Sequence, residues 1–137
     1  MDRLLIDTDI LIDLFFDREP FAEGAETIFS LCEDGTVDGY ITSVICSNCY
    51  YILRKTATHK KVVKQLRSLL TILHVLVTDK DILMRALDSE FNDFEDAIQN
   101  FSAIEHGEIQ AVITRNTKDY RKSNLVVFTP DEFLAAL

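Results

Sequence analysis

The chain is poor in features that define several protein classes. It has only three cysteines, an odd number, and no signal peptide, so we expect a reducing compartment and no disulfide framework. Four aspartates interrupt its apolar N-terminus, which excludes a secretory core and a membrane span. It also lacks internal repeats, low-complexity segments and linkers. At 137 residues, we therefore expect one cytoplasmic domain over 1–137, large enough to bury a core without disulfides and with no membrane association.

Acidic residues are absent between Gly39 and Thr78, although the net charge is -9. The overall sign argues against non-specific nucleic-acid binding by bulk charge. The acid-free window nevertheless holds one basic group, and a second lies near the C-terminus. If both lie on one side, that surface can carry a phosphate backbone; a solvated helix face is the alternative. The two groups are Arg54, Lys55, Lys60, Lys61, Lys64 and Arg67, and then Arg115, Lys118, Arg121 and Lys122.

Apolar periodicity predicts strands that alternate with helices. Short apolar runs predict strands over 4–6, 37–41, 72–77, 110–114 and 125–128. Capping and stop signals predict the intervening helices: one through 10–14, one with Pro20 in its first turn and a stop at Gly35, one opened by Thr42-Ser43, then 58–70, 80–88 after Thr78-Asp79, one opened by Asn92-Asp93, and a last one from Thr129-Pro130 to 137. This alternation predicts an α/β fold with a parallel sheet covered on both faces.

The stretch from Leu4 to Asp13 combines apolar positions that predict burial with several carboxylates. Asp7 falls at the carboxyl end of the first predicted strand. Ligands of open parallel sheets bind outside those strand ends, so we expect Asp7 to face a site; a turn residue is the alternative. Thr8 or Asp9 is expected to cap the following helix.

A second acidic group opens the sixth predicted helix. Asp93 and Asp96 are three residues apart, so both carboxylates project to one face of the helix. A favourable interaction with the helix dipole is a sufficient explanation for Asp93 and Glu95. It explains Asp96 less well, because Asp96 lies nearer the apolar stripe.

A polar loop follows the strand predicted at 110–114. It brings the oxygen donors Thr114, Asn116 and Asp119 toward the same edge of the sheet as Asp7. Asn116 and Asp119 are also ordinary turn formers. Mg²⁺ and Mn²⁺ prefer oxygen ligands and keep several waters, so two or three carboxylates suffice for such a site.

These motifs together resemble the PIN-domain family, most closely the VapC-type toxins of bacterial toxin–antitoxin pairs. The resemblance covers the whole chain in order and rests on Asp7-Thr8-Asp9, Asp93-Phe-Glu-Asp96-Ala, Thr114-Arg-Asn-Thr-Lys-Asp119-Tyr and Phe128-Thr-Pro-Asp-Glu-Phe133. It implies a three-layer α/β/α sandwich with a mostly parallel sheet and Mg²⁺- or Mn²⁺-dependent endoribonuclease activity. It also implies an antitoxin partner, with a homodimer as a further expectation.

The resemblance assigns roles by position. Asp7 and Asp96 become metal ligands, and Asp119 or Asn116 completes the site. We expect the catalytic residues to be Asp7, Asp96 and Asp119, and the metal ligands to be Asp7, Asp96 and Asp93. Supporting roles fall to Thr8, Asp9, Ser43, Asn48, Thr114 and Asn116. RNA phosphates are expected at Arg54, Lys55, Arg115 and Lys118.

One position departs from the family pattern. The family usually has a glutamate on the third helix, two residues before the stretch Tyr50-Tyr51-Ile52-Leu53-Arg54, and this chain has Asn48 there with no acid nearby. Loss of one carboxylate removes a formal charge, which should weaken divalent binding and hold a second metal poorly.

Three other interpretations remain open. Asp7-Thr8-Asp9 also fits the Asp-x-Asp motif of haloacid-dehalogenase-like phosphatases, in which the first aspartate is a nucleophile. Asn48 also fits a binding module that kept the fold and lost the chemistry. Cys46-x-x-Cys49 invites a zinc or redox site, but its helical, apolar setting favours buried free thiols.

Overall fold

The computed structural model describes residues 2–137 and contains a five-stranded sheet in the order β3-β2-β1-β4-β5. All four strand pairings are parallel. The sheet therefore has the parallel arrangement that the alternating pattern predicts. The strands are β1 (Asp2–Ile6), β2 (Val37–Thr42), β3 (His74–Leu76), β4 (Ala111–Ile113) and β5 (Val126–Phe128).

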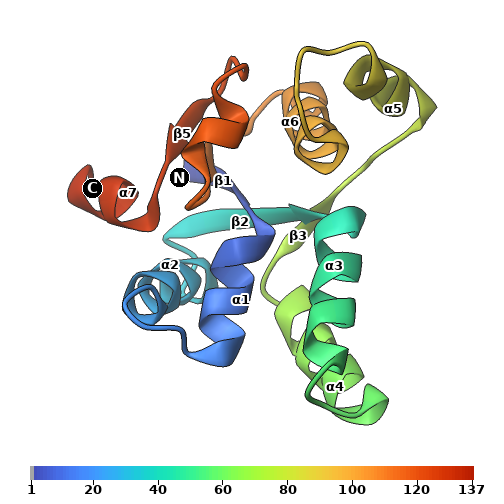
Figure 1. Ribbon diagram of the computed structural model, residues 1–137. Coiled ribbons are helices and arrows are strands. Elements are labelled where there is room, and N and C mark those ends of the chain that lie inside the picture. The colour runs from blue at the N-terminus through green and yellow to red at the C-terminus, as the bar shows by residue number, and fades with distance from the viewer. Residues whose placement is uncertain (1) are drawn as a thin grey trace.

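Helices cover both faces of this sheet. Figure 1 shows α1 to α4 on one side of the sheet and α5 and α6 on the other, which gives the predicted three layers. The helices are α1 (Thr8–Phe16), α2 (Ala22–Glu33), α3 (Ser43–Arg54), α4 (His59–Leu70), α5 (Lys80–Leu87), α6 (Phe94–His106), the 3₁₀ helix η1 (Thr117–Tyr120) and α7 (Pro130–Ala135). None of the helices within 2–137 has both the length and the apolarity to cross a membrane.

Side-chain caps fix most helix starts where the sequence predicts them. The N-caps of α3, α4, α5, α6 and α7 each accept a hydrogen bond from a first-turn N–H; they are Thr42, Thr58, Asp79, Asp93 and Thr129. In α7 the carboxylate of Glu132 completes a capping box. These short polar residues are strong local signals, so the starts of these five helices are predicted well.

Two local predictions are wrong. Neither Thr8 nor Asp9 caps α1, because Asp7 is the N-cap and its Oδ1 accepts from the N–H of Thr8. Pro20 does not lie in the first turn of α2, because it follows Glu19 in a cis peptide and α2 begins at Ala22. The loop after β4 also contains η1, which its turn-forming residues did not predict.

The core lies around the central strands and the helices beside them. Leu5 and Ile113 are fully buried on the neighbouring strands β1 and β4. Cys49 is also fully buried, on α3, and burial raises the pKa of its thiol to about 12. All three cysteines are free. Cys32 is also buried, whereas Cys46 is half-buried, so the predicted burial holds for Cys49 and only in part for Cys46.

The strand register positions the site. The N–H of Asp7 donates to the carbonyl of Ile113, and the N–H of Thr114 donates to that of Phe128, so the pairing continues one residue past the ends of β1 and β4. Asp7 and Thr114 therefore leave the sheet side by side at its carboxyl edge.

Candidate active site

A cavity of about 530 Å³ opens at this edge of the sheet. Residues of α1, α3, α6 and the segment after β4 line it, so four parts of the chain far apart in sequence meet there. Carboxylates dominate its lining: Asp7, Asp9, Asp93, Glu95, Asp96 and Asp119. Lys55 and Arg18 are the bases that line it.

Asp7 is held rigidly at the base of the cavity. One carboxylate oxygen caps α1 through the N–H of Thr8 at 2.8 Å, and the other accepts from the hydroxyl of Thr114 at 2.9 Å. Burial and the neighbouring charge of Asp9 raise the pKa of Asp7 to about 6, although both hydrogen bonds favour the ionised form. Its carboxylate thus carries an unfavourable charge that a cation would offset.

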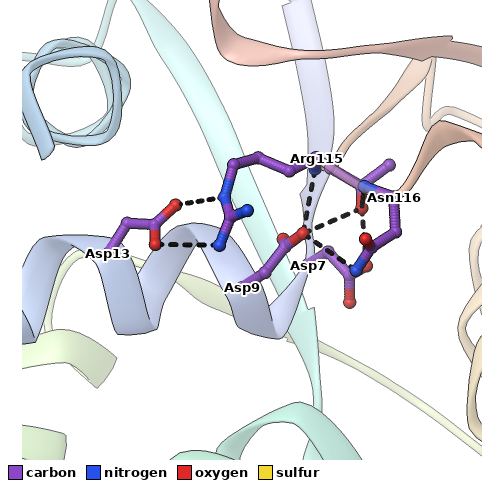
Figure 2. Close-up of polar contacts among 6 residues, drawn as sticks. Asp7, Asp9, Asp13, Arg115 and Asn116 are labelled. Atoms are coloured by element: carbon purple, nitrogen blue, oxygen red, sulfur yellow. Dashed lines mark hydrogen bonds and ion pairs between the residues drawn. The ribbon is translucent and has the colours of Figure 1, made fainter. Parts of the chain in front are cut away.

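Asp9 ties the first turn of α1 to the segment after β4. Its Oδ2 accepts from the backbone N–H of Arg115 at 2.9 Å and from the side-chain amide of Asn116 at 3.3 Å (Figure 2). Its Oδ1 is buried and has no hydrogen-bond partner within 2–137. Burial raises the pKa of Asp9. These contacts make Asp9 an anchor of the loop rather than the predicted helix cap.

An ion pair behind Asp9 was not predicted from the sequence. Asp13 is fully buried, and Arg115 contacts it with Nε at 2.6 Å and Nη2 at 3.1 Å (Figure 2). The guanidinium also lies over the ring of Phe21, 4.0 Å from its centroid. The only sequence signal for this pair was a carboxylate among the apolar residues of α1.

The first turn of α6 brings Asp96 into the cavity. Burial raises the pKa of Asp96 to about 7, and the negative charges of Asp7, Asp93 and Asp119 contribute after it. Asp96 lines the cavity together with Asp7 and Asp119. Asp93 lines the same cavity, but its Oδ1 accepts from the N–H of Asp96 as the cap of α6.

Glu95 changes the expectation for position 48. The side-chain amide of Asn48 donates to Glu95 Oε2 at 2.7 Å, and both residues line the cavity. The expectation that no acid lies near Asn48 is therefore wrong, because the fold brings Glu95 of α6 against Asn48 of α3. Sequence spacing could not show this contact, because the two residues are 47 positions apart.

The other predicted polar residues divide between the cavity and its surroundings. Thr8, Asn116 and Asp119 line the cavity, and Thr114 lies fully buried behind Asp7. Ser43 begins α3 with an exposed side chain and does not line the cavity. Six lining residues were not predicted as part of the site, because their types carry no distinctive signal there: Ile12, Arg18, Tyr51, Ile52, Glu95 and Gln99.

Of the four predicted phosphate contacts, Lys55 lines the cavity. Arg54 instead donates to the carbonyl of Ala57, and the guanidinium of Arg115 binds Asp13. Lys118 lines a neighbouring hollow of about 330 Å³ together with Arg121 and Lys122. The structure therefore does not gather the four bases on one surface of the cavity.

The donor chemistry of the cavity suits a hydrated divalent cation. Its lining offers carboxylate and amide oxygens, which hard cations prefer. Within residues 2–137, no three His, Cys, Asp or Glu side chains converge closely enough to hold an ion by themselves. One or two carboxylates with several retained waters is the usual arrangement for Mg²⁺, and the lining fits that arrangement.

The comparisons with known proteins identify the family. The family model of the PIN domain matches residues 3–118, so the chain belongs to the PIN domain family. This favours the PIN resemblance over the phosphatase alternative. No curated protein sequence matches the chain.

Solved structures share the fold over nearly the whole chain. A toxin–antitoxin complex from Klebsiella pneumoniae is 26% identical, covers 93% of this chain and 97% of its own, and has a TM-score of 0.69. VapBC2 from Rickettsia felis, bound to a promoter DNA fragment, is 14% identical, covers 93% of this chain and 98% of its own, and has a TM-score of 0.69. VapC20 from Mycobacterium tuberculosis, a sarcin-ricin loop cleaving toxin, is 16% identical, covers 98% of this chain and 95% of its own, and has a TM-score of 0.62.

Proposed function

We propose that the protein is a divalent-metal-dependent endoribonuclease and the toxin of a toxin–antitoxin pair, acting on RNA in the cytoplasm. The observation that carries this proposal is the cavity at the carboxyl edge of the sheet, whose lining brings together Asp7, Asp96 and Asp119 from separate parts of the chain. Membership of the PIN family supports it, because nucleases of this family use divalent metals.

The residues of the cavity divide the work of phosphodiester hydrolysis. Asp7 and Asp96 would hold Mg²⁺ or Mn²⁺, with Asp93 and Asp119 adding negative charge. The bound cation would polarise the phosphodiester and lower the pKa of the attacking water. Thr8 and Thr114 fix the orientation of Asp7 through its two oxygens.

Substrate binding falls to groups on the cavity wall. Lys55 places a positive charge beside the carboxylates, where an RNA phosphate would lie. Tyr51 has an exposed side chain at the same wall and offers a ring on which a base can stack. The RNA-cleaving neighbour VapC20 supports RNA as the substrate class.

An antitoxin helix would suit a second groove, of about 520 Å³, between α1, α2 and α4. Its apolar residues include Leu14, Phe15 and Phe29, and its charged residues are Lys61, Lys64 and Glu33, so the bases outnumber the acid. An amphipathic helix with acidic flanks would complement this combination of apolar surface and positive charge. The Klebsiella pneumoniae and Rickettsia felis complexes support a partner of this kind.

The alternative is a PIN-type binding module with impaired catalysis. The neutral side chain of Asn48 on the cavity wall favours this alternative, because it reduces the charge available to a metal. Metal binding separates the two functions, since a binding module would not need it.

The test is a calorimetric titration of Mn²⁺ into the protein and its Asp7→Asn and Asp96→Asn variants, with cleavage of a fluorescent RNA followed in parallel. The nuclease proposal expects saturable binding and cleavage, both lost in the variants while the fold persists. Glu105→Gln, a surface change on α6, is the matched control. Cleavage that persists in either aspartate variant would contradict the site, and absent binding would favour the module.

A further inference from the structure

We infer that Glu95 supplies the metal site with an additional carboxylate, which Asn48 holds in place from the opposite wall of the cavity. The inference rests on the proposed nuclease function and deepens it. Asn48 Nδ2 donates to Glu95 Oε2 at 2.7 Å, and both side chains line the cavity together with Asp7 and Asp96.

The contact spans two layers of the fold. Asn48 belongs to α3 and Glu95 to α6, which lie on opposite sides of the sheet (Figure 1). The cap that Asp93 forms on α6 fixes the turn from which Glu95 projects, and Asp96 projects from the same turn. A helix start and a hydrogen bond thus place Glu95 in the lining of the cavity.

The neutral partner is the informative part of this pair. An amide orients the carboxylate by donating a hydrogen bond and leaves its negative charge in place, whereas an arginine or lysine would neutralise that charge. A carboxylate has about four lone-pair sites, so the bond to Asn48 leaves others for a cation or its bound waters. The pair therefore delivers one negative charge at the position where the chain has an amide in place of an acid.

This arrangement offsets the loss predicted for Asn48. The attraction between a cation and a carboxylate depends on their separation and not on the helix that carries the side chain. A carboxylate from α6 that contacts residue 48 lies close to where a carboxylate on α3 would be. The site then keeps its total charge with a different connection to the chain.

The competing role for Glu95 is structural, as a link between α3 and α6. The two roles differ in what Glu95→Gln does. Glutamine keeps an oxygen that accepts from Asn48, so the link survives while the charge is lost. A structural role predicts unchanged metal binding, and a role in the metal site predicts weaker binding.

The test measures Mn²⁺ affinity by calorimetry in four proteins: the wild type, Glu95→Gln, the exchange variant Asn48→Glu/Glu95→Gln, and the control Glu105→Gln. We expect Glu95→Gln to weaken Mn²⁺ binding about 10- to 100-fold, as for other groups that support metal ligands. The exchange variant returns the carboxylate to α3 and keeps a hydrogen bond between the same positions, so it should recover most of the affinity. Glu105→Gln removes one charge from the exposed side of the same helix and should leave affinity unchanged.

The outcomes separate this inference from the proposed function. Equal Mn²⁺ affinity in Glu95→Gln and Glu105→Gln overturns the role of Glu95, while the nuclease proposal stands if Asp96→Asn still abolishes binding. A loss in Glu95→Gln that the exchange variant does not recover also overturns it, because the charge at this contact is what the inference asserts. No Mn²⁺ binding in the wild type overturns the proposed function itself. Thermal unfolding of each variant confirms that the fold is kept.

Discussion

Arg115 donates two side-chain hydrogen bonds to the buried carboxylate of Asp13, from Nε at 2.6 Å and from Nη2 at 3.1 Å (Figure 2). Its backbone N–H donates a further hydrogen bond to Asp9. One residue thus joins α1 to the segment that follows β4. This segment carries Asn116 and leads to Asp119, both on the cavity wall. The ion pair therefore fixes the position of one side of the site without lining it.

Removal of this arginine should be costly. Arg115→Met leaves Asp13 buried without a counter-charge, and we expect the free energy of unfolding to fall by about 3–5 kcal/mol. Urea denaturation measures the change. The double variant Asp13→Asn/Arg115→Met removes both charges and should recover part of the loss. A cost below about 1 kcal/mol for Arg115→Met would show that the pair is no stronger than a surface salt bridge.

The Asp13–Arg115 pair also marks the limit of prediction from the sequence. Local signals predicted the strands, their parallel arrangement and the place of Asp7, because a strand end followed by an acid is visible in a few residues. The rule that ligands bind outside the carboxyl ends of parallel strands also predicted that the loop with Asp119 lies at this edge. The resemblance to PIN domains, and not this rule, assigned Asp96 to the site. The resemblance to PIN domains added the three-layer arrangement, which the structure confirms.

Contacts between distant segments could not be predicted in this way. An arginine in a polar loop is typical of phosphate binding, so the sequence predicted this role for Arg115. Only the register of β4 beside β1 brings its side chain to Asp13. From the sequence, Glu95 is an ordinary first-turn acid of a helix. Only the tertiary arrangement of α3 and α6 shows that it contacts Asn48. Residue type predicts what a side chain can bind, whereas tertiary structure decides which partner it meets.

The metal-free protein should lose stability as pH rises. The pKa of Asp96 is about 7 in the fold against 3.8 when exposed, so between these values the folded protein retains a proton that the unfolded chain has released. Asp7, at about 6, acts in the same direction. Stability from these groups is therefore highest near pH 4 and falls up to about pH 7.

Asp96→Asn should flatten this pH dependence, because it removes the proton that titrates. We expect the variant to exceed the wild type by about 1–2 kcal/mol at pH 8 in EDTA, a value discounted for the partial exposure of Asp96. Urea denaturation at pH 5 and pH 8 measures the difference. Glu105→Gln is the control, and a wild type as stable at pH 8 as at pH 5 would contradict the raised pKa values.

Thr114 should matter for both stability and the state of Asp7. Its buried hydroxyl donates to Asp7 Oδ2 and accepts from the N–H of Asn116, and Thr114→Val removes both bonds while keeping the side-chain shape. We expect a loss of about 1–3 kcal/mol in the free energy of unfolding. We also expect the pKa of Asp7 to rise further, since this hydrogen bond lowers it. Thr114→Ser keeps the hydroxyl but removes a buried methyl group, which costs about 1 kcal/mol by itself. NMR titration therefore separates the two variants, because Thr114→Ser should leave the pKa of Asp7 unchanged.

Lys55 should contribute to RNA binding and not to the fold. It lines the cavity from the end of α3, so Lys55→Gln removes about one phosphate contact. Binding of single-stranded RNA, measured by fluorescence anisotropy in an Asp96→Asn background that cannot cleave, should weaken, and the slope of log affinity against log salt should decrease by about 0.7. Lys60→Gln, on the exposed surface of α4, is the matched control. Equal losses in the two variants would mean that RNA responds to overall charge, and the cavity would then lose its assignment as the substrate site.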